Sequence, residues 1–434
     1  MSLQQKLLSP RYKRLGLEAF WILLGQILST IGSLLSVRVL TQYLDMANYG
    51  QLALGLTVVT FVGQFLMSPL GQGIQRYYTP SVEEGDSRGY WKNVQALLSK
   101  TIVLISLFAI ITSGILYFWG YKYWLLVFIA FIFAIFDGYN SNLIAIQNAA
   151  RQRLIVTILS NCLIWLRLGM ALLFIYLFGA KDYIVLSGYV LASFIIALSQ
   201  VFFIKKVLNK QVNNLLPKHE DWSKKILAYS YPFTIWGIFT WALLVSDRWA
   251  LEYFTSSLEV AQFVVLFQLG YSPIAIITGF AMTFLGPIIF SRAGNGEDNT
   301  RNENVNKLIF RIVIVALSIT ALAFLFVLLL HSFIFQIFVA KQYLGISYLL
   351  PWMVLSGGLF ATGQAISLKF LSEMKVKTMI TPKIVTALIG IVLNIGGAYF
   401  WGVGGVVCAS ILFSLIYFLW LVTLAITTKK LLTQ

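Results

Sequence analysis

The chain has 434 residues, of which 59% are hydrophobic and 11% charged, and its mean hydropathy is +0.82. A soluble domain carries roughly 25% charged residues and could not cover this much apolar side chain, so a water-soluble enzyme or binding domain is excluded. The formal charge of +16 would suit a nucleic-acid-binding protein, but the distribution of that charge along the chain indicates another origin.

Apolar runs long enough to cross a bilayer recur along the whole sequence. A spanning helix needs about 20 such residues, whereas alternating ten-residue segments of the barrel type are absent. The pattern predicts an all-α polytopic membrane protein of about twelve helices, at residues 16–40, 50–72, 95–118, 123–146, 154–178, 183–204, 227–250, 261–290, 305–330, 347–371, 379–400 and 403–427. Cys162 and Cys408 fall inside predicted spans, which indicates neither a disulfide framework nor a metal cluster.

Basic residues mark one side of the predicted membrane. With the N-terminus inside, 26 of the 32 Lys and Arg residues lie in the inside segments. The positive-inside rule then predicts that both termini are cytoplasmic. Orientation therefore accounts for the charge, and no nucleic-acid partner is expected. Three arginines remain within or at the edge of predicted spans: Arg38, Arg167 and Arg248.

The sequence repeats part of itself after half its length. At an offset of about 210 residues, the first half aligns with the second at Ser36, Arg38, Tyr43 and Leu44 against Ser246, Arg248, Tyr253 and Phe254. Both copies enter the membrane from the cytoplasm, so the repeats are parallel, as in transporters whose two bundles rock about a central site. We therefore expect six-helix bundles at 1–204 and 226–434, joined by a polar cytoplasmic linker at 205–225.

Three segments resemble a known transporter family. These are "RVLTQYLDMANYGQLAL" at 38–54, "IQNAARQR" at 146–153 and "LAYSYPFTIWGIFTWALLVSDRWALEYF" at 227–254. They resemble the Wzx-type O-antigen and exopolysaccharide flippases of the polysaccharide-transport family. That family belongs to the superfamily of the multidrug and toxic-compound extruders and the lipid II flippases. The lipid II branch usually has two more helices, for which this length leaves no room.

The resemblance implies a fold and a cargo. It implies two bundles forming a V around a polar lumen, in a bacterial inner membrane. The implied activity, without any enzymatic step, is the flipping of undecaprenyl-pyrophosphate-linked repeat units from the cytoplasmic to the periplasmic leaflet. The product would be O-antigen in lipopolysaccharide, capsule or exopolysaccharide. The expected partners are this anionic lipid-linked glycan, membrane lipid, a polysaccharide polymerase and a chain-length regulator.

Such a cargo needs fixed cations, because unpaired charge is costly in hydrocarbon. Arginine suits phosphate, since its planar fork stays charged and binds two oxygens. No Gly-rich ATP-binding loop with its lysine occurs, and no cofactor is expected. The membrane potential would favour outward movement of two negative charges by roughly 2.3 kcal/mol each per 100 mV. Coupling to H⁺ or Na⁺ stays an open alternative.

The candidate substrate contacts on the seventh helix share one face. Arg248 follows Thr234, Gly237 and Trp241 at helical spacing, so it is a candidate lumen contact. The alternative is an interfacial arginine paired with Asp247 or Glu252. Arg38 is either a lumen contact or a snorkelling anchor. Two prolines are candidate gating kinks or static kinks: Pro232 and Pro273.

The fourth helix carries a polar stripe that either touches sugar hydroxyls or joins helices. Its candidate substrate contacts are Asp137, Asn140, Ser141 and Asn148. Asp137 and Arg167 lie on either side of the 151–153 turn, each about 22 Å from it along a helix. Charges at one depth tend to pair, which predicts an ion pair that is either structural or in contact with substrate.

Three other functions compete with a flippase. A cation-coupled multidrug extruder on the same fold would need a carboxylate-lined lumen, whereas this chain offers intramembrane arginines. A membrane polymerase or ligase would need a large outer loop, but the longest outer segment, about 331–346, is short. The third is a non-transporting scaffold.

Overall fold

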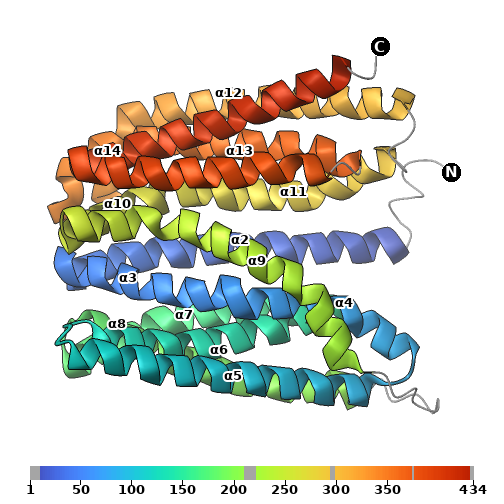
Figure 1. Cartoon of the computed structure of the whole chain (residues 1–434), viewed down its shortest axis with the longest axis horizontal. Coiled ribbons are helices and arrows are strands. Elements are labelled where there is room, and N and C mark those ends of the chain that lie inside the picture. The colour runs from blue at the N-terminus through green and yellow to red at the C-terminus, as the bar shows by residue number, and fades with distance from the viewer. Residues whose placement is uncertain (1–9, 210–220, 294–298, 374–375, 431–434) are drawn as a thin grey trace. The chain divides into compact units, whose positions relative to one another are not determined.

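The chain is helical from one end to the other of the part that the structure describes. The computed structural model describes residues 10–209, 221–293, 299–373 and 376–430. Its α-helices are α2 (Pro10–Tyr43), α3 (Met46–Val62), α4 (Ser68–Glu83), α5 (Ser87–Phe118), α6 (Trp124–Ala149), α7 (Arg153–Phe178), α8 (Asp182–Asn209), α9 (Trp222–Phe254), α10 (Ser257–Leu266), α11 (Ser272–Ala293), α12 (Asn299–Phe338), α13 (Leu350–Ser372) and α14 (Ile380–Lys430) (Figure 1). Four short helical turns complete the described elements: η1 (Gly63–Met67), η2 (Phe267–Tyr271), η3 (Lys341–Leu349) and η4 (Val376–Met379).

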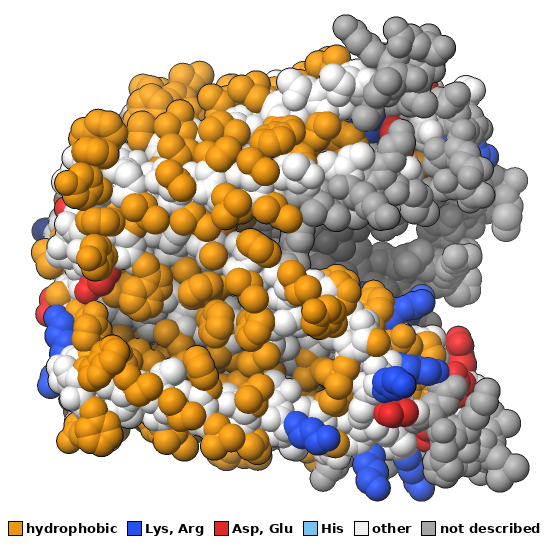
Figure 2. Space-filling view, in the orientation of Figure 1, with side chains coloured by type: hydrophobic (Ala, Val, Ile, Leu, Met, Phe, Trp, Pro, Cys, Tyr) orange, Lys and Arg blue, Asp and Glu red, His pale blue; other side chains and the backbone are white. Residues whose placement is uncertain are grey.

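The predicted all-α membrane architecture is confirmed. Within the described ranges, eleven helices are long and apolar enough to cross a bilayer. Hydrophobic side chains cover the middle of the face shown in Figure 2, and the coloured Lys and Arg side chains gather near helix ends. The helices extend beyond the predicted spans; α5, for example, begins at Ser87 and not at 95. Hydropathy marks only the hydrocarbon part of a helix, and the polar ends continue past it.

α14 contains two of the predicted spans. Its 51 residues would extend about 76 Å, more than twice the ~30 Å hydrocarbon core. The helix breaks at Trp401 and Gly402, where the backbone leaves helical geometry, between the predicted spans 379–400 and 403–427. With this break, the eleven candidate helices correspond to the twelve predicted ones.

Only glycine fits the break in α14. Gly402 has φ +54° and ψ −136°, a region that side chains with a Cβ avoid. A Cβ on Gly402 would also lie 2.2 Å from Oε2 of Glu259. That oxygen accepts a hydrogen bond from the backbone N–H of Val403 at 2.7 Å, so a carboxylate on α10 caps the helix that begins there.

The chain forms two compact units. Unit 1 comprises Met1–Ser36 and Leu52–Trp241, and unit 2 comprises Val37–Gln51 and Ala242–Gln434. α2, α3 and α9 each begin in one unit and end in the other, so these bounds differ from the predicted bundles. Most of the predicted linker, 210–220, lies outside the described residues, and its end, 222–225, begins α9.

A π-helical turn interrupts the second long helix of each repeat. η1 runs directly into Ser68 and Pro69, and η2 runs directly into Ser272 and Pro273. A glutamine stands at the second position of both turns, so the motif Gln-x₃-Ser-Pro occurs twice, at an offset of 204 residues. Proline lacks an N–H for the preceding turn, and a π turn is one way to relieve the loss. The repeat predicted from the sequence thus has a structural counterpart.

Each unit has a hydrophobic core near the predicted cytoplasmic ends of its helices. In unit 1, Trp222 is fully buried in a cluster with Tyr78 and Tyr90. Its indole N–H donates to Oδ2 of Asp86 at 2.8 Å, and Asp86 also accepts from the backbone N–H of Gly89 at the start of α5. The unit 2 cluster joins α11, α12, α13 and α14. The beginning of α9 is therefore anchored in unit 1.

Candidate functional site

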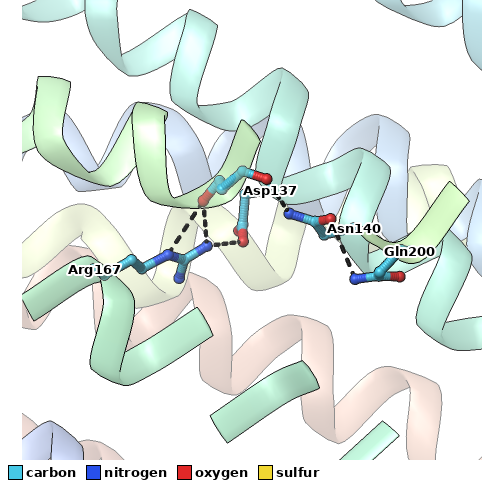
Figure 3. Close-up of polar contacts among 5 residues, drawn as sticks. Asp137, Asn140, Arg167 and Gln200 are labelled. Atoms are coloured by element: carbon cyan, nitrogen blue, oxygen red, sulfur yellow. Dashed lines mark hydrogen bonds and ion pairs between the residues drawn. The ribbon is translucent and has the colours of Figure 1, made fainter. Parts of the chain in front are cut away.

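The predicted ion pair between α6 and α7 is confirmed. Nη2 of Arg167 contacts Oδ1 of Asp137 as both an ion pair and a hydrogen bond (Figure 3). The two helices are consecutive and antiparallel, and each residue lies the same number of residues from their turn, which puts the side chains at one level. Charges in the apolar middle of a helix pair are costly unless they compensate each other, as these do.

A polar network holds the arginine of this pair. Nε and Nη2 of Arg167 donate to Oγ of Ser193 on α8 at 3.3 and 3.1 Å. The carbonyl oxygen of Ser193 accepts from Nδ2 of Asn140 at 2.8 Å, and Oδ1 of Asn140 accepts from Nε2 of Gln200 at 3.2 Å. Figure 3 shows this chain of contacts between Arg167 and Gln200, with Asn140 between them. The guanidinium also lies over the ring of Phe133, 4.7 Å from its centroid.

The pair is only partly buried. The side chain of Arg167 is 21% exposed and that of Asp137 is 38% exposed. The contacts of Arg167 use Nε and Nη2, and within the described residues nothing hydrogen-bonds to Nη1. A guanidinium has five N–H donors, so the Nη1 donors can bind a further oxyanion while the pair stays intact. We define Asp137, Arg167, Ser193, Asn140 and Gln200 as the α6–α8 site.

The rest of the predicted stripe on α6 does not join this site. Ser141 is exposed and lies outside the network. Asn148 accepts a hydrogen bond through Oδ1 from Nη1 of Arg153 at 2.6 Å, about 16 Å along the helix from Asp137. Asn148 therefore contacts the turn between α6 and α7.

The predicted polar face of α9 packs against α3 in unit 1. Nε1 of Trp241 donates to the carbonyl oxygen of Thr57 at 3.0 Å, and its ring meets Phe61 edge to face. A Cβ on Gly237 would lie 2.0 Å from the carbonyl oxygen of Gln64. Thr234, one turn earlier, donates to the carbonyl of its own helix at Ser230. These side chains make helix contacts, and their predicted role toward substrate stays a prediction.

Arg248 lies in unit 2 against an aromatic ring. Its guanidinium carbon is 5.5 Å from the centroid of Phe267, at the start of η2, and its Nε is buried without a hydrogen-bond partner among the described residues. The expected alternative pairing does not form within the described part of the chain. Asp247 accepts from the backbone N–H of Arg248, and Glu252 accepts from the hydroxyl of Ser257.

Arg38 has a role that the sequence did not predict. Nη1 of Arg38 donates to the carbonyl oxygen of Val339, just past the end of α12. The backbone N–H of Ala340 donates to Oγ1 of Thr41. A cation on the last carbonyls of a helix satisfies unpaired acceptors and the negative end of the helix dipole. Arg38 is therefore a cap for α12 within unit 2.

The two predicted gating prolines occupy different settings. Pro232 lies inside α9 on an exposed face, where it removes one helical hydrogen bond. Pro273 stands at the start of α11, directly after η2.

Among the described residues, no group of His, Cys, Asp and Glu is arranged to hold a metal ion.

Sequence reasoning missed two members of the α6–α8 site. Ser193 and Gln200 lie in the apolar α8, which carries no other signal of function. They are seven residues apart, two helical turns on one face. That spacing is a weak signal, because serine and glutamine inside apolar helices are also common helix–helix contacts.

Comparison with known proteins identifies the fold. No family profile and no curated protein sequence matches this chain. Among solved structures, it is similar to an inward-facing multidrug resistance MATE transporter of the MOP superfamily, with a TM-score of 0.72, 14% identity and coverage of 93% of this chain and 96% of that one. It is similar to the lipid II flippase MurJ in an inward closed conformation, with a TM-score of 0.66, 14% identity and coverage of 94% and 87%.

A third similar structure is a MOP superfamily transporter from Pyrococcus furiosus, whose binding pocket is described as having reverse polarity suggesting a different function. Its TM-score is 0.60, with 14% identity and coverage of 96% and 95%. At this identity the likeness establishes the fold and not the cargo. The chain therefore has the multi-pass helical fold of the MATE and MurJ transporters.

Proposed function

We propose that this chain is a flippase that moves polyprenyl-pyrophosphate-linked oligosaccharide repeat units from the cytoplasmic to the outer leaflet of the membrane. The observation that carries the proposal is the α6–α8 site, where a partly exposed arginine inside two candidate membrane-spanning helices has Nη1 donors that no described residue uses. The fold shared with MATE and MurJ transporters supports transport, and the resemblance to Wzx-type flippases supports the cargo.

The chemistry of the α6–α8 site suits a diphosphate. A guanidinium is a permanent cation whose planar fork suits phosphate oxygens, and the Nη1 donors of Arg167 are not used by any described residue. Asp137 and Ser193 fix the guanidinium before the anion arrives, so little side-chain entropy is lost on binding. Because Asp137 keeps its contact with Nη2 throughout, the guanidinium is not left without a countercharge when the anion leaves, which permits release. A site of this kind binds and releases an anion and needs no covalent chemistry.

A cation-coupled extruder is the second candidate, and one observation favours it. Asp137 is the more exposed member of the pair, at 38%, and a partly exposed carboxylate inside a membrane can exchange a proton or bind a cation. The same residue could couple flipping to H⁺ or Na⁺. The two functions differ in their cargo, which is an anionic lipid in one and a cationic small molecule in the other.

Genetic complementation tests the proposal. In a polysaccharide-producing host that lacks its own flippase, this chain should restore surface polysaccharide and prevent lipid-linked repeat units from accumulating. Arg167→Ala should abolish the rescue, Arg167→Lys should restore part of it, and Arg88→Ala, at an exposed arginine of α5, should behave as wild type. Export of cationic dyes without any rescue would favour the extruder.

The remaining parts of the proposal concern the membrane location, the partner proteins and the transport cycle. The basic inside segments support an inner-membrane protein with cytoplasmic termini. A polymerase and a chain-length regulator would act next on the flipped repeat unit. Alternating access would occur by relative movement of units 1 and 2, through the helices that they share.

A further inference from the structure

Unit 2 contains an apolar groove that the proposed function does not use. It lies among α11, α12 and α13 and has a volume of about 490 Å³. α12 forms one wall, from Arg311 to Ala323, and α11 forms the other, from Ile274 to Leu285. α13 forms the floor, where Gly358 lies so close to α12 that an added Cβ would be 2.2 Å from Thr320.

Small side chains open this groove along its length. Alanines face it from all three helices, among them Ala281, Ala316 and Ala361. The stretch from Arg311 to Ala323 rises about 18 Å along α12, close to the depth of one leaflet of a ~30 Å hydrocarbon core. Its length and apolar walls therefore match a hydrocarbon chain that lies along one leaflet.

A single cation stands at one end of the groove. Arg311 lines it, follows the polar beginning of α12 and precedes 27 residues that carry no Asp, Glu, Lys or Arg. Its side chain is exposed and makes no hydrogen bond or ion pair with the described residues. By the charge distribution, this end faces the cytoplasm. The groove thus combines an apolar slot with a cation that has no partner among the described residues, at the end that we expect to face the cytoplasm.

We infer that this groove binds the isoprenoid chain of a phosphorylated polyprenyl lipid, with the phosphate on Arg311, and so holds the lipid carrier in the cytoplasmic leaflet before its headgroup is moved. The identification of the bound lipid as a polyprenyl phosphate rests on the proposed function. The groove and its cation are observed independently of that function. A methyl-branched isoprenoid is wider than a straight acyl chain, and the alanines set among the larger aliphatic side chains of the lining leave room for its branches. The guanidinium fork selects the phosphorylated lipid over the free alcohol.

Photolabelling of the purified full-length protein in nanodiscs of phosphatidylethanolamine and phosphatidylglycerol tests the inference. The probe is a polyprenyl phosphate with diazirines along the part of its isoprenoid chain that would occupy the groove, and labelled peptides are identified by mass spectrometry. Label should concentrate on the groove segments 274–285 and 311–323. Ala316→Phe, which fills the groove, should lower this labelling about tenfold or more, because the buried part of the chain is displaced.

Ala321→Phe is the matched control. It makes the same change on the same helix at an exposed position outside the groove, and it should label as wild type does. Arg311→Gln should reduce labelling by the phosphate probe to the level of the matching polyprenol probe, whereas Arg311→Lys should retain part of the difference. This second comparison does not depend on how well Ala316→Phe folds.

Three outcomes would overturn the inference. Label spread over all lipid-facing helices, equal labelling by phosphate and alcohol probes, or loss of label on raising the phosphatidylglycerol fraction would each mean that the groove holds ordinary membrane lipid. Failure of the proposed function is separable. If the complementation host shows no rescue but groove labelling persists, the lipid site stands without that cargo. If rescue occurs without groove labelling, the flippase stands and this site does not.

Discussion

Neutralising either member of the Asp137–Arg167 pair should lower the free energy of unfolding. Neutralising both should lower it by less than the sum of the two single effects. Removing one partner of a fully buried pair costs about 3–5 kcal/mol, whereas an exposed pair contributes only about 0–1 kcal/mol. With side chains 21% and 38% exposed, the pair lies between these limits. We expect a coupling free energy of about 2 kcal/mol.

The single changes should not be equivalent. Asp137→Asn leaves a guanidinium that still donates to Ser193 and packs on Phe133. Arg167→Met leaves a carboxylate that is 38% exposed and has lost its countercharge. Midpoints of thermal unfolding for wild type, both single variants and the double variant, all in the same detergent, give the cycle. If the two single shifts simply add, the ion pair contributes no coupling and this account of the α6–α8 site is wrong.

Exchanging the two charges separates structure from transport. Asp137→Arg with Arg167→Asp keeps opposite charges at one depth but moves the cation from α7 to α6, away from the Ser193 hydroxyl. We expect membrane insertion to recover and export to stay impaired, because the oriented guanidinium is lost. Recovery of both insertion and export would show that the pair is structural. If neither single variant has any effect, the pair has no role.

Further predictions follow from topology and from particular contacts. A reporter fused after Gln434 should be cytoplasmic and one inserted near Gly120 periplasmic; a periplasmic C-terminus would contradict the even number of spans. Arg248→Ala should abolish export while the protein reaches normal levels in the membrane, and Arg248→Lys should retain part of the export. Full rescue by the alanine variant would show that Arg248 has only a structural role. Gly402→Ala should lower the thermal midpoint, since the strained backbone alone costs about 1–3 kcal/mol; Gly404→Ala, with open space around it, is the control and should not.

The fold was predictable because hydrocarbon imposes a strong pattern on sequence. Spans need long apolar runs, and these located the candidate membrane spans of the described residues, including the two inside α14. The predicted spans were shorter than the observed helices, because the polar ends of helices carry no hydropathy signal. The π turns of η1 and η2 were not predicted, although the repeated Gln-x₃-Ser-Pro motif begins inside each turn and ends just after it. Alignment on the arginines hid this second repeat, since its offset differs by six residues.

The α6–α8 site was only half predictable. Asp137 and Arg167 could be paired from the sequence because a short turn fixes the levels of two antiparallel helices. Ser193 and Gln200 could not, since placing α8 beside α6 and α7 requires the packing of three helices. On α9, helical spacing correctly grouped the polar and small residues on one face, but it could not predict which element packs against that face. That face meets α3 through Trp241 and η1 through Gly237, and small or polar residues at a helix contact resemble those of a binding surface.

The two repeated arginines show why position in a repeat does not define a role. Arg38 and Arg248 occupy equivalent places in sequence, yet Arg38 caps the end of α12 and Arg248 lies over Phe267. Aligning the two Gln-x₃-Ser-Pro motifs puts Gly63 at the position of Phe267. Glycine offers no ring for a cation, so Arg38 has no equivalent contact there and uses a helix terminus instead. Arg248, with a buried Nε left without a partner among the described residues, stays the one of the two that we predict to contact substrate.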